Sequence, residues 1–255
     1  MDLFWGIFLT VAGAAIGSFL NVLIHRVPTG QSIVFPPSHC PKCKKGIRFY
    51  DNIPIVSYLM LRGRCRDCQE KISLRYPFVE AITAFLSLFL FWKFGLSSHY
   101  LFSFAFTCAL IIITFIDLDH QIIPDVITLP GIPIFFLIAV FFMGIPWLEA
   151  LLGILIGGGC LFAIAFLYEV ITKREGMGGG DIKLLAMLGA FLGWKSLFFI
   201  LFVSSLLGAV VGISVMMARG KDMKYAVPFG PFLSIAAVAY LFVGSDVMNY
   251  LYFRY

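Results

Sequence analysis

Charged side chains are scarce in this 255-residue chain: Asp, Glu, Lys and Arg make up only 13% of it, whereas 60% of the residues are hydrophobic. Soluble domains contain about 25% charged and about 45–50% apolar residues. The scarcity of charge therefore excludes an ordinary soluble protein. Together with a mean hydropathy of +0.95, it favours a chain that lies mostly within a lipid bilayer.

Polar interruptions of the hydrophobic sequence are also few. Runs able to cross about 30 Å of hydrocarbon recur along the chain, some strong and two weaker. The strong runs are residues 3–24, 78–94, 100–116, 127–143, 148–170 and 196–217, and the weaker ones are 184–193 and 228–243. This pattern predicts an all-α polytopic membrane protein with about eight transmembrane helices.

A basic segment is missing ahead of the first run, where Asp2 stands instead. A cleavable signal peptide needs a basic start and small residues at its cleavage site, but His25 and Arg26 follow this run. We therefore expect residues 1–24 to stay as the first transmembrane helix.

Lys and Arg are nearly absent from one side of the predicted topology, which holds only Lys93, Lys195 and Arg254. The other 16 of the 19 basic residues are Arg26, Lys42, Lys44, Lys45, Arg48, Arg62, Arg64, Arg66, Lys71, Arg75, Lys173, Arg174, Lys183, Arg219, Lys221 and Lys224. The positive-inside rule makes their side cytoplasmic, so both termini are expected outside. Topology and anionic lipid headgroups explain the net charge of +5 without a nucleic acid partner.

Residues 25–77 form the one sizeable polar segment, and four of the six cysteines lie in it. They are arranged as Cys40-Pro-Lys-Cys43 and Cys65-Arg-Asp-Cys68, two C-x2-C pairs with 21 residues between them. This spacing suits a tetrahedral thiolate site and predicts structural zinc. The alternative is two reduced or disulfide-linked pairs, although a reducing cytoplasm disfavours disulfides. So short a segment buries little apolar core, so the metal would contribute much of its folding free energy.

Acidic residues inside or at the ends of membrane helices are costly, which makes their positions informative. One group, Asp117, Asp119 and Asp125, follows the third strong run, and Asp181 follows the fifth. Both groups fall on the predicted cytoplasmic side and can therefore meet. Two carboxylates held close together cannot both ionise easily, so the pair can act as acid and base on one water, as in aspartic proteases.

Asp117 is the best candidate in the first group because it is nearest the apolar run, where desolvation is greatest. Asp125 follows Pro124 and is expected to cap the next helix, while Asp119 and His120 lie in solvent or support the site. Asp181 follows Gly178, Gly179 and Gly180, which permit close approach of a substrate backbone. The plainer alternative is that Asp181 only caps the helix after a glycine loop.

Two further features of the apolar runs are interpreted as structural. Glu80 stands three residues after Pro77, at the start of the second run, where a helix N-terminus favours an acid without any function. Gly153-x-x-x-Gly157 and Gly189-x-x-x-Gly193 have the spacing that permits close helix packing.

The chain closely resembles the type IV prepilin peptidase family, the leader peptidases/N-methyltransferases, over nearly its whole length. The resemblance rests on ordered motifs. They are Gly17-Ser18-Phe19-Leu20-Asn21-Val22, His25-Arg26-Val27-Pro28, His39-Cys40-Pro41-x-Cys43, Tyr50-Asp51-Asn52-Ile53-Pro54, Arg62-Gly63-Arg64-Cys65-x-x-Cys68, Ile72-Ser73-x-Arg75-Tyr76-Pro77 with Glu80, Ile116-Asp117-x-x-His120-x-x-x-Pro124-Asp125 and Gly176-Met177-Gly178-x-Gly180-Asp181-x-Lys183-Leu184.

Membership would imply an enzyme of the bacterial inner membrane that cleaves the leader of prepilins or pseudopilins after a glycine. It would also imply methylation of the new N-terminal amine with S-adenosylmethionine. The family's catalytic aspartates fall on Asp117 and Asp181, and we expect Gly178, Gly180 and Lys183 to belong to a loop that contacts the substrate backbone. The methyltransferase rests on the resemblance alone, because no Gly-x-Gly-x-x-Gly loop follows a strand.

The resemblance suggests three parts: a first transmembrane helix over residues 1–24, a small cytoplasmic methyltransferase region with the four-cysteine site over 25–77, and a transmembrane peptidase domain over 78–255. Two other functions stay open. An intramembrane aspartic protease of unrelated helices would share the Gly-x-Gly-Asp motif. A transporter or metal sensor would place acids near mid-membrane and often shows repeated halves, whereas the acids here lie at one face and no internal repeat is seen.

Overall fold

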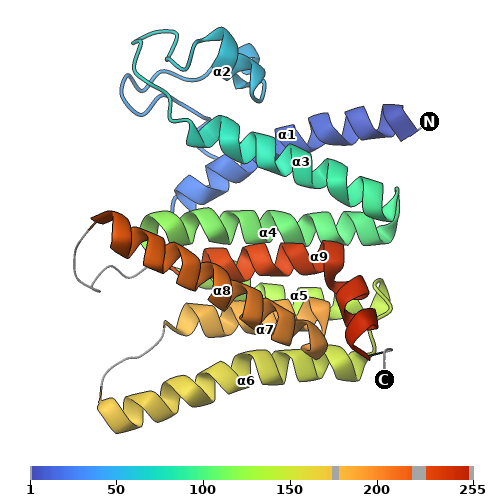
Figure 1. The fold of residues 1–255 in the computed structure, drawn as a ribbon. Coiled ribbons are helices and arrows are strands. Elements are labelled where there is room, and N and C mark those ends of the chain that lie inside the picture. Colours follow the sequence, from blue (N-terminus) through green and yellow to red (C-terminus); the bar gives the residue numbers. More distant parts are fainter. Residues whose placement is uncertain (1, 174–177, 220–227, 253–255) are drawn as a thin grey trace. The chain divides into compact units, whose positions relative to one another are not determined.

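The computed structural model describes residues 2–173, 178–219 and 228–252 (Figure 1). The chain divides into two compact units, Met1–Ile112 and Ile113–Tyr255. The division falls inside a helix, α4, which covers Ser98–His120. The boundaries predicted at residues 24 and 77 remain a prediction.

Within the described residues the regular secondary structure is helical. The elements are α1 (Asp2–Arg26), the 3-10 helix η1 (Phe49–Asn52), α2 (Val56–Met60), α3 (Arg75–Phe94), α4 (Ser98–His120), α5 (Asp125–Phe141), α6 (Trp147–Thr172), α7 (Gly179–Leu192), α8 (Trp194–Arg219) and α9 (Gly230–Tyr252). Each predicted hydrophobic run is one of the longer helices. The all-α membrane class expected from the sequence is therefore confirmed.

Five of these helices are long and apolar enough to cross a membrane: Leu3–Arg26, Arg75–Phe94, Ser98–His120, Trp147–Thr172 and Trp194–Met217. Asp125–Phe141 and Gly230–Gly244 are shorter apolar helices. The weakest predicted run corresponds to α7, whose 14 residues rise only about 21 Å. A helix that short cannot span the hydrocarbon layer alone, so it depends on surrounding protein.

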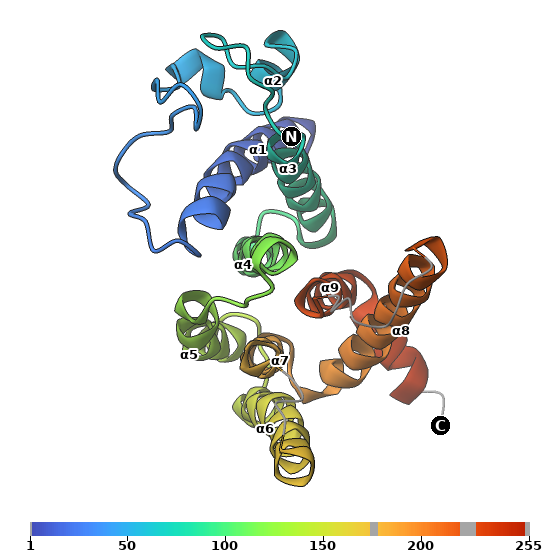
Figure 2. The same ribbon diagram turned by 90° about the vertical axis from the view of Figure 1, so that its left-hand side faces the viewer.

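In the first unit, α1 packs along α3 at two glycines (Figure 2). A Cβ on Gly13 would lie 3.0 Å from the Cα of Ala84, and one on Gly17 would lie 2.8 Å from the Cα of Glu80. Small residues at these positions let the two backbones approach closely, as in other membrane helix pairs. The hydroxyl of Ser87 in α3 also donates to the carbonyl of Leu9 at 2.9 Å.

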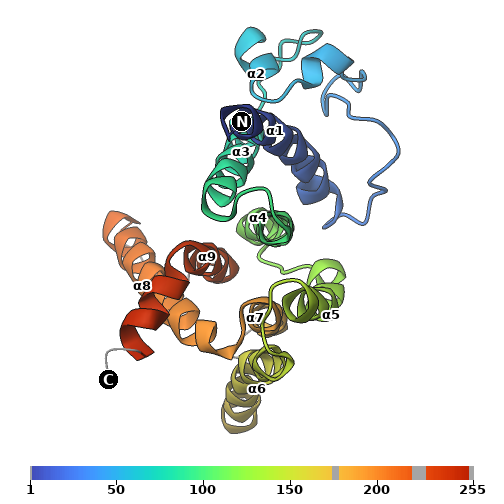
Figure 3. The same ribbon diagram turned by 90° about the vertical axis from the view of Figure 1, so that its right-hand side faces the viewer.

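In the second unit, α7 contacts both α5 and α6, and Figure 3 shows it between them. The backbones of α6 and α7 meet at Gly153 and Gly189, where a Cβ on either residue would lie within 2.2 Å of the other's carbonyl oxygen. Gly153 and Gly189 therefore permit the close helix packing that their spacing predicted. Gly193 instead ends α7, with a φ of 79°.

The side chains of α7 from Leu184 to Phe191 are all buried. The helix is thus the core of this unit and has little surface left for lipid. Its N-terminal turn carries Asp181, so the rigid packing of α7 fixes the position of that carboxyl group.

Candidate functional site

Asp117 lies in the last turn of α4 and is buried, with 5% of its surface exposed. Its Oδ2 atom accepts a hydrogen bond of 3.0 Å from the backbone N–H of Gly230. Gly230 is the first residue of α9, so the positive end of that helix dipole faces the carboxylate. Both the hydrogen bond and the dipole favour the ionised form of Asp117.

The approach between α9 and Asp117 requires glycine at position 230. A Cβ there would lie 2.6 Å from Oδ2 of Asp117 and 3.2 Å from Cδ1 of Ile123. Any larger residue would push the N–H away from the carboxylate or move the aspartate. Nothing in the sequence singled out Gly230, because a backbone donor leaves no residue-type signal.

Asp181 lies in the first turn of α7 and is partly buried. Burial, and to a lesser extent the negative charge of Asp117, raises the pKa of its carboxyl group to about 6. Ile123, in the loop between α4 and α5, lies beside both aspartate-bearing regions. Its side chain would contact a Cβ added at Gly180, next to Asp181, and one added at Gly230, which binds Asp117. The surroundings of Asp117 and Asp181 therefore adjoin at Ile123.

Two of the three glycines before Asp181 border open space. Gly178 precedes the first residue of α7 and is exposed, and an added Cβ on Gly178 or Gly179 would meet no atom within 4 Å. Because Gly178 occupies the capping position, Asp181 is not the N-cap residue of α7. Gly176 and Met177 of the same motif lie outside the described residues.

Lys183 binds Asp125 rather than standing alone: its Nζ lies 2.7 Å from one carboxylate oxygen and 2.8 Å from the other. This ion pair joins the N-terminal turns of α7 and α5. The capping role expected for Asp125 is not observed, because Pro124 is the N-cap and Asp125 is the first residue of α5. Asp119 and His120 are exposed at the end of α4.

The second candidate site is the cysteine cluster of the first unit. The four sulfur atoms of Cys40, Cys43, Cys65 and Cys68 all lie within 4.8 Å of one another, and none forms a disulfide. The Sγ atoms of Cys40 and Cys68 are 3.7 Å apart. In a tetrahedral site with Zn–S bonds of about 2.3 Å, two sulfurs are about 3.8 Å apart. The cluster therefore has the ligand set and the size for one metal ion.

Two equivalent turns present these sulfurs. In the first, the backbone N–H of Cys40 donates to the carbonyl of Lys45, and in the second the N–H of Cys65 donates to Glu70. Each turn continues through a residue of positive φ directly after its second cysteine, Lys44 at 60° and Gln69 at 57°. Backbone hydrogen bonding from Cys43 is the main reason that the pKa of the Cys40 thiol is lowered to about 6. The pKa of Cys68, which shares hydrogen bonds with the other thiols, is raised to about 11. The four thiols therefore interact, and a bound cation would favour the thiolate form in all of them.

Ion pairs connect the two turns. Lys45 lies 3.0 Å from Asp67, and Lys42 binds Glu70. The first turn supplies both lysines and the second supplies both acids, so charge complementarity holds the turns facing each other. These pairs are exposed to solvent, so each contributes little to stability. They orient the turns, and a bound metal would supply most of the stability.

Glu80 is a buried acid of the first unit, with 8% of its surface exposed. We expected an ordinary position at a helix N-terminus, but α3 begins at Arg75 and Glu80 lies in its second turn. Its Oε2 accepts a 2.7 Å hydrogen bond from the N–H of Ile55, a β-branched residue with a φ of 63°. Glu80 thus holds α2 and its preceding turn against α3, an effect that sequence spacing does not reveal.

Comparison with known proteins gives matches to both halves of the chain. Residues 11–94 match the bacterial peptidase A24 N-terminal domain, and residues 104–213 match the type IV leader peptidase family. Among solved structures, no significant match is found.

Curated relatives align with nearly the whole chain. It is 37% identical over 260 residues to the prepilin leader peptidase/N-methyltransferase of Pseudomonas putida, covering 93% of this chain and 90% of the relative. Proteins of the same name from Neisseria gonorrhoeae and Legionella pneumophila are 39% identical over 250 residues and 35% identical over 285 residues. These alignments cover 89% and 96% of this chain and 86% and 94% of the relatives. The chain therefore belongs to the type IV leader peptidase family.

Proposed function

We propose that this protein cleaves the leader peptide from type IV prepilins or pseudopilins and then methylates the new N-terminal amine. Family membership supports both activities, since the relatives are named for them. The observation that carries the peptidase is the buried carboxylate of Asp117, which interacts with Asp181 from another helix. No part of this reaction requires a metal or a covalent intermediate.

The two aspartates have different surroundings, which supports a division of roles. Asp117 accepts the N–H of Gly230 and is the base: its carboxylate takes a proton from water as the water oxygen bonds to the scissile carbonyl carbon. Asp181 is the acid and gives its proton to the carbonyl oxygen. Cleavage of the C–N bond then releases the amine, which takes the proton from Asp117, and Asp181 regains its own as the carbonyl re-forms.

The open glycine loop supports a role in substrate binding. Gly178 and Gly179 present backbone without a side chain beside Asp181, so an extended peptide can lie against them. Lys183 orients this loop through its ion pair with Asp125. Its contribution is to hold the start of α7 in place for the peptide.

The first unit is the proposed methyltransferase region, with residues 25–77 as its core and a structural zinc ion on the four cysteines. S-adenosylmethionine, when bound, supplies an electrophilic methyl group for the substrate amine. The cysteine cluster supports the zinc assignment, since its sulfur spacing fits the ion. We place residues 25–77 and the aspartates at the cytoplasmic face of the bacterial inner membrane, since most Lys and Arg residues fall on that side of the predicted topology.

The peptidase is tested with Asp117→Asn and Asp181→Asn, each purified in detergent and incubated with a prepilin. Either variant is expected to lose leader cleavage on a gel by at least about a thousandfold, because each removes a proton donor or acceptor. Asp119→Asn is the matched control and should cleave normally. Methylation of a precleaved substrate should persist in all three. Substantial cleavage by either variant would remove that residue from the active pair.

A further inference from the structure

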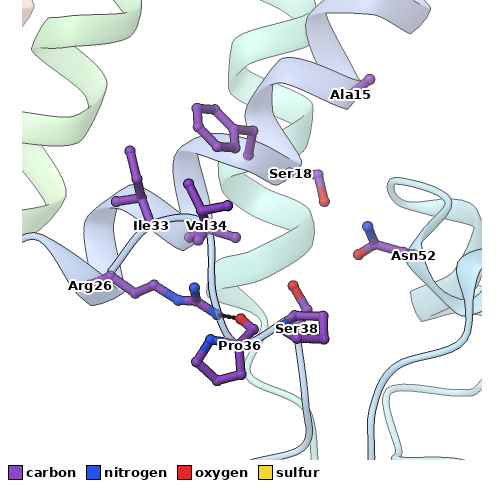
Figure 4. A pocket seen from close by; sticks show the side chains of 11 residues that line it. Ala15, Ser18, Arg26, Ile33, Val34, Pro36, Ser38 and Asn52 are labelled. Carbon is purple, nitrogen blue, oxygen red and sulfur yellow. Dashed lines mark hydrogen bonds between the residues drawn. The ribbon is translucent and has the colours of Figure 1, made fainter. Parts of the chain in front are cut away.

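A cavity of about 260 Å³ lies in the first unit, between the C-terminal half of α1 and the segment that follows it. Ser18 and Arg26 of α1, Ser38 and Asn52 line it, together with apolar side chains that include Phe19 and Val22. Figure 4 shows these polar side chains arranged around a common space. The volume is slightly below the range of about 300–1,000 Å³ for small-molecule sites, so it can hold part of a cofactor.

Arg26 is the unusual member of this lining. It is buried, with 8% of its surface exposed, and its guanidinium donates to the carbonyls of Ser32 at 2.8 Å and Pro36 at 2.6 Å. No acidic side chain pairs with it among the described residues. A guanidinium has five N–H donors, and a buried charge is costly without a partner of opposite sign. The carboxylate of a bound ligand would supply that partner.

The other polar groups suit a zwitterionic ligand. Ser18 makes a hydrogen bond with the buried carboxyl group of Glu80, so an acidic side chain lies one hydrogen bond away from the cavity. Ser38 and Asn52 offer further hydrogen-bonding atoms, and Phe19 and Val22 offer apolar contact. One cation, one nearby carboxyl group and an apolar wall fit an amino acid group attached to a less polar body.

We propose that this cavity binds the amino-acid end of S-adenosylmethionine, with Arg26 paired to its carboxylate. This inference rests on the methyltransferase activity proposed above and assigns it a site. The rest of the cofactor extends through the open side of the cavity. An anionic lipid headgroup would offer a phosphate to the same guanidinium, so the experiment must separate these two sources of negative charge.

The test is equilibrium binding of radiolabelled S-adenosylmethionine to the full-length protein in nanodiscs of phosphatidylcholine, which carry no net charge. Arg26→Gln is expected to weaken binding by about tenfold or more, because it removes a charge-assisted pair. Arg26→Lys keeps the charge but loses the planar fork, so it should bind with intermediate affinity. Val22→Phe, which fills the cavity and leaves Arg26 intact, should also weaken binding.

Arg62→Gln is the matched control, because Arg62 is a more accessible arginine of the same unit that does not line the cavity, and it should bind as the unaltered protein does. Leader cleavage should be unchanged in every variant, since the aspartates belong to the other unit. Unchanged cofactor binding by Arg26→Gln would overturn the proposal. It would also be overturned if this variant kept its cofactor binding but lost phosphatidylglycerol that copurifies with the unaltered protein, because Arg26 would then bind a lipid headgroup. If the unaltered protein neither cleaves nor methylates a prepilin, the proposed function itself fails.

Discussion

Gly230 is decisive at the residue scale because its backbone N–H donates to the buried carboxylate of Asp117 at 3.0 Å. A buried carboxylate needs such donors to stay ionised, since desolvation favours its neutral form. The proposed base is therefore specified by a residue that has no side chain. Gly230 is a positioning residue, which acts on the reaction only through Asp117.

Gly230→Ala is expected to lower the kcat of leader cleavage about ten- to hundredfold, the effect of losing one charge-assisted hydrogen bond. Because the carboxylate becomes harder to ionise, the acidic limb of the pH–rate profile should move to higher pH. Initial cleavage rates measured across a pH series would show both effects.

Gly212→Ala is the matched control, since a Cβ at Gly212 would meet no atom within 4 Å. It should leave the rate and the pH profile unchanged. A merely structural role for Gly230 would lower the amount of active enzyme without moving the profile. An unshifted acidic limb would therefore contradict the positioning role.

The sequence allowed some of these residues to be selected and not others. Asp117 and Asp181 were selected because acids at the ends of apolar runs are rare and costly. Gly230 lies 113 positions from Asp117 and contributes only backbone, so nothing in its residue type announced the contact. Arg26 was noted as a positive charge and as part of a family motif but was given no binding role, because burial without an acidic partner is visible only in three dimensions.

At the scale of elements, the two cysteine turns show what regular spacing can predict. The C-x2-C spacing was sufficient to predict that four thiols meet, and they do so. The crossed ion pairs of Lys42 with Glu70 and Lys45 with Asp67 were not predicted, because they depend on how the two turns face each other.

Cys40→Ser is expected to reduce bound zinc from about one ion per chain to almost none, because a tetrahedral structural site needs all four thiolates. The 25–77 segment should then become sensitive to limited proteolysis, since metal binding contributes about 10–16 kcal/mol in comparable zinc-binding peptides. Metal analysis of the purified protein and a protease time course measure the two effects.

Cys160→Ser provides the control, because Cys160 is an exposed residue of α6 outside the cluster. It should retain zinc and resist the protease. Intact protein without zinc, prepared without chelator, would contradict the metal assignment even if the cysteines were essential for folding.

Helix α7 is the element for which sequence reasoning was weakest. Its apolar run was short, and a short run does not distinguish a membrane span from a buried core helix. The structure gives the reason: Leu184 to Phe191 are covered by protein, and Gly189 meets Gly153 of α6 backbone to backbone. Protein packing thus replaces the length that a lipid-facing helix would need.

For the whole molecule, the division into two units separates the two proposed chemistries. The cysteine cluster and the Arg26 cavity belong to Met1–Ile112, while both aspartates and Gly230 belong to Ile113–Tyr255. The family matches fall in a similar order, over residues 11–94 and 104–213. Variants in one unit should therefore affect one activity and spare the other.

The membrane class of the molecule could be predicted from composition, because 13% charged residues are too few for the surface of a soluble protein of this size. Which helices pack against each other could not be predicted. It depends on close backbone approaches such as those at Gly13, Gly17 and Gly153, and glycine in an apolar run fits many partners equally well.

The central claim is that Asp117 and Asp181 share one water, and the separation of their carboxyl groups in an experimental structure of the active enzyme in lipid tests it most directly. The account predicts nearest oxygens within about 5.5 Å, the reach of two hydrogen bonds through one water. Carboxyl groups held more than about 8 Å apart, with or without a bound prepilin, would be beyond that reach and would contradict the hydrolytic mechanism.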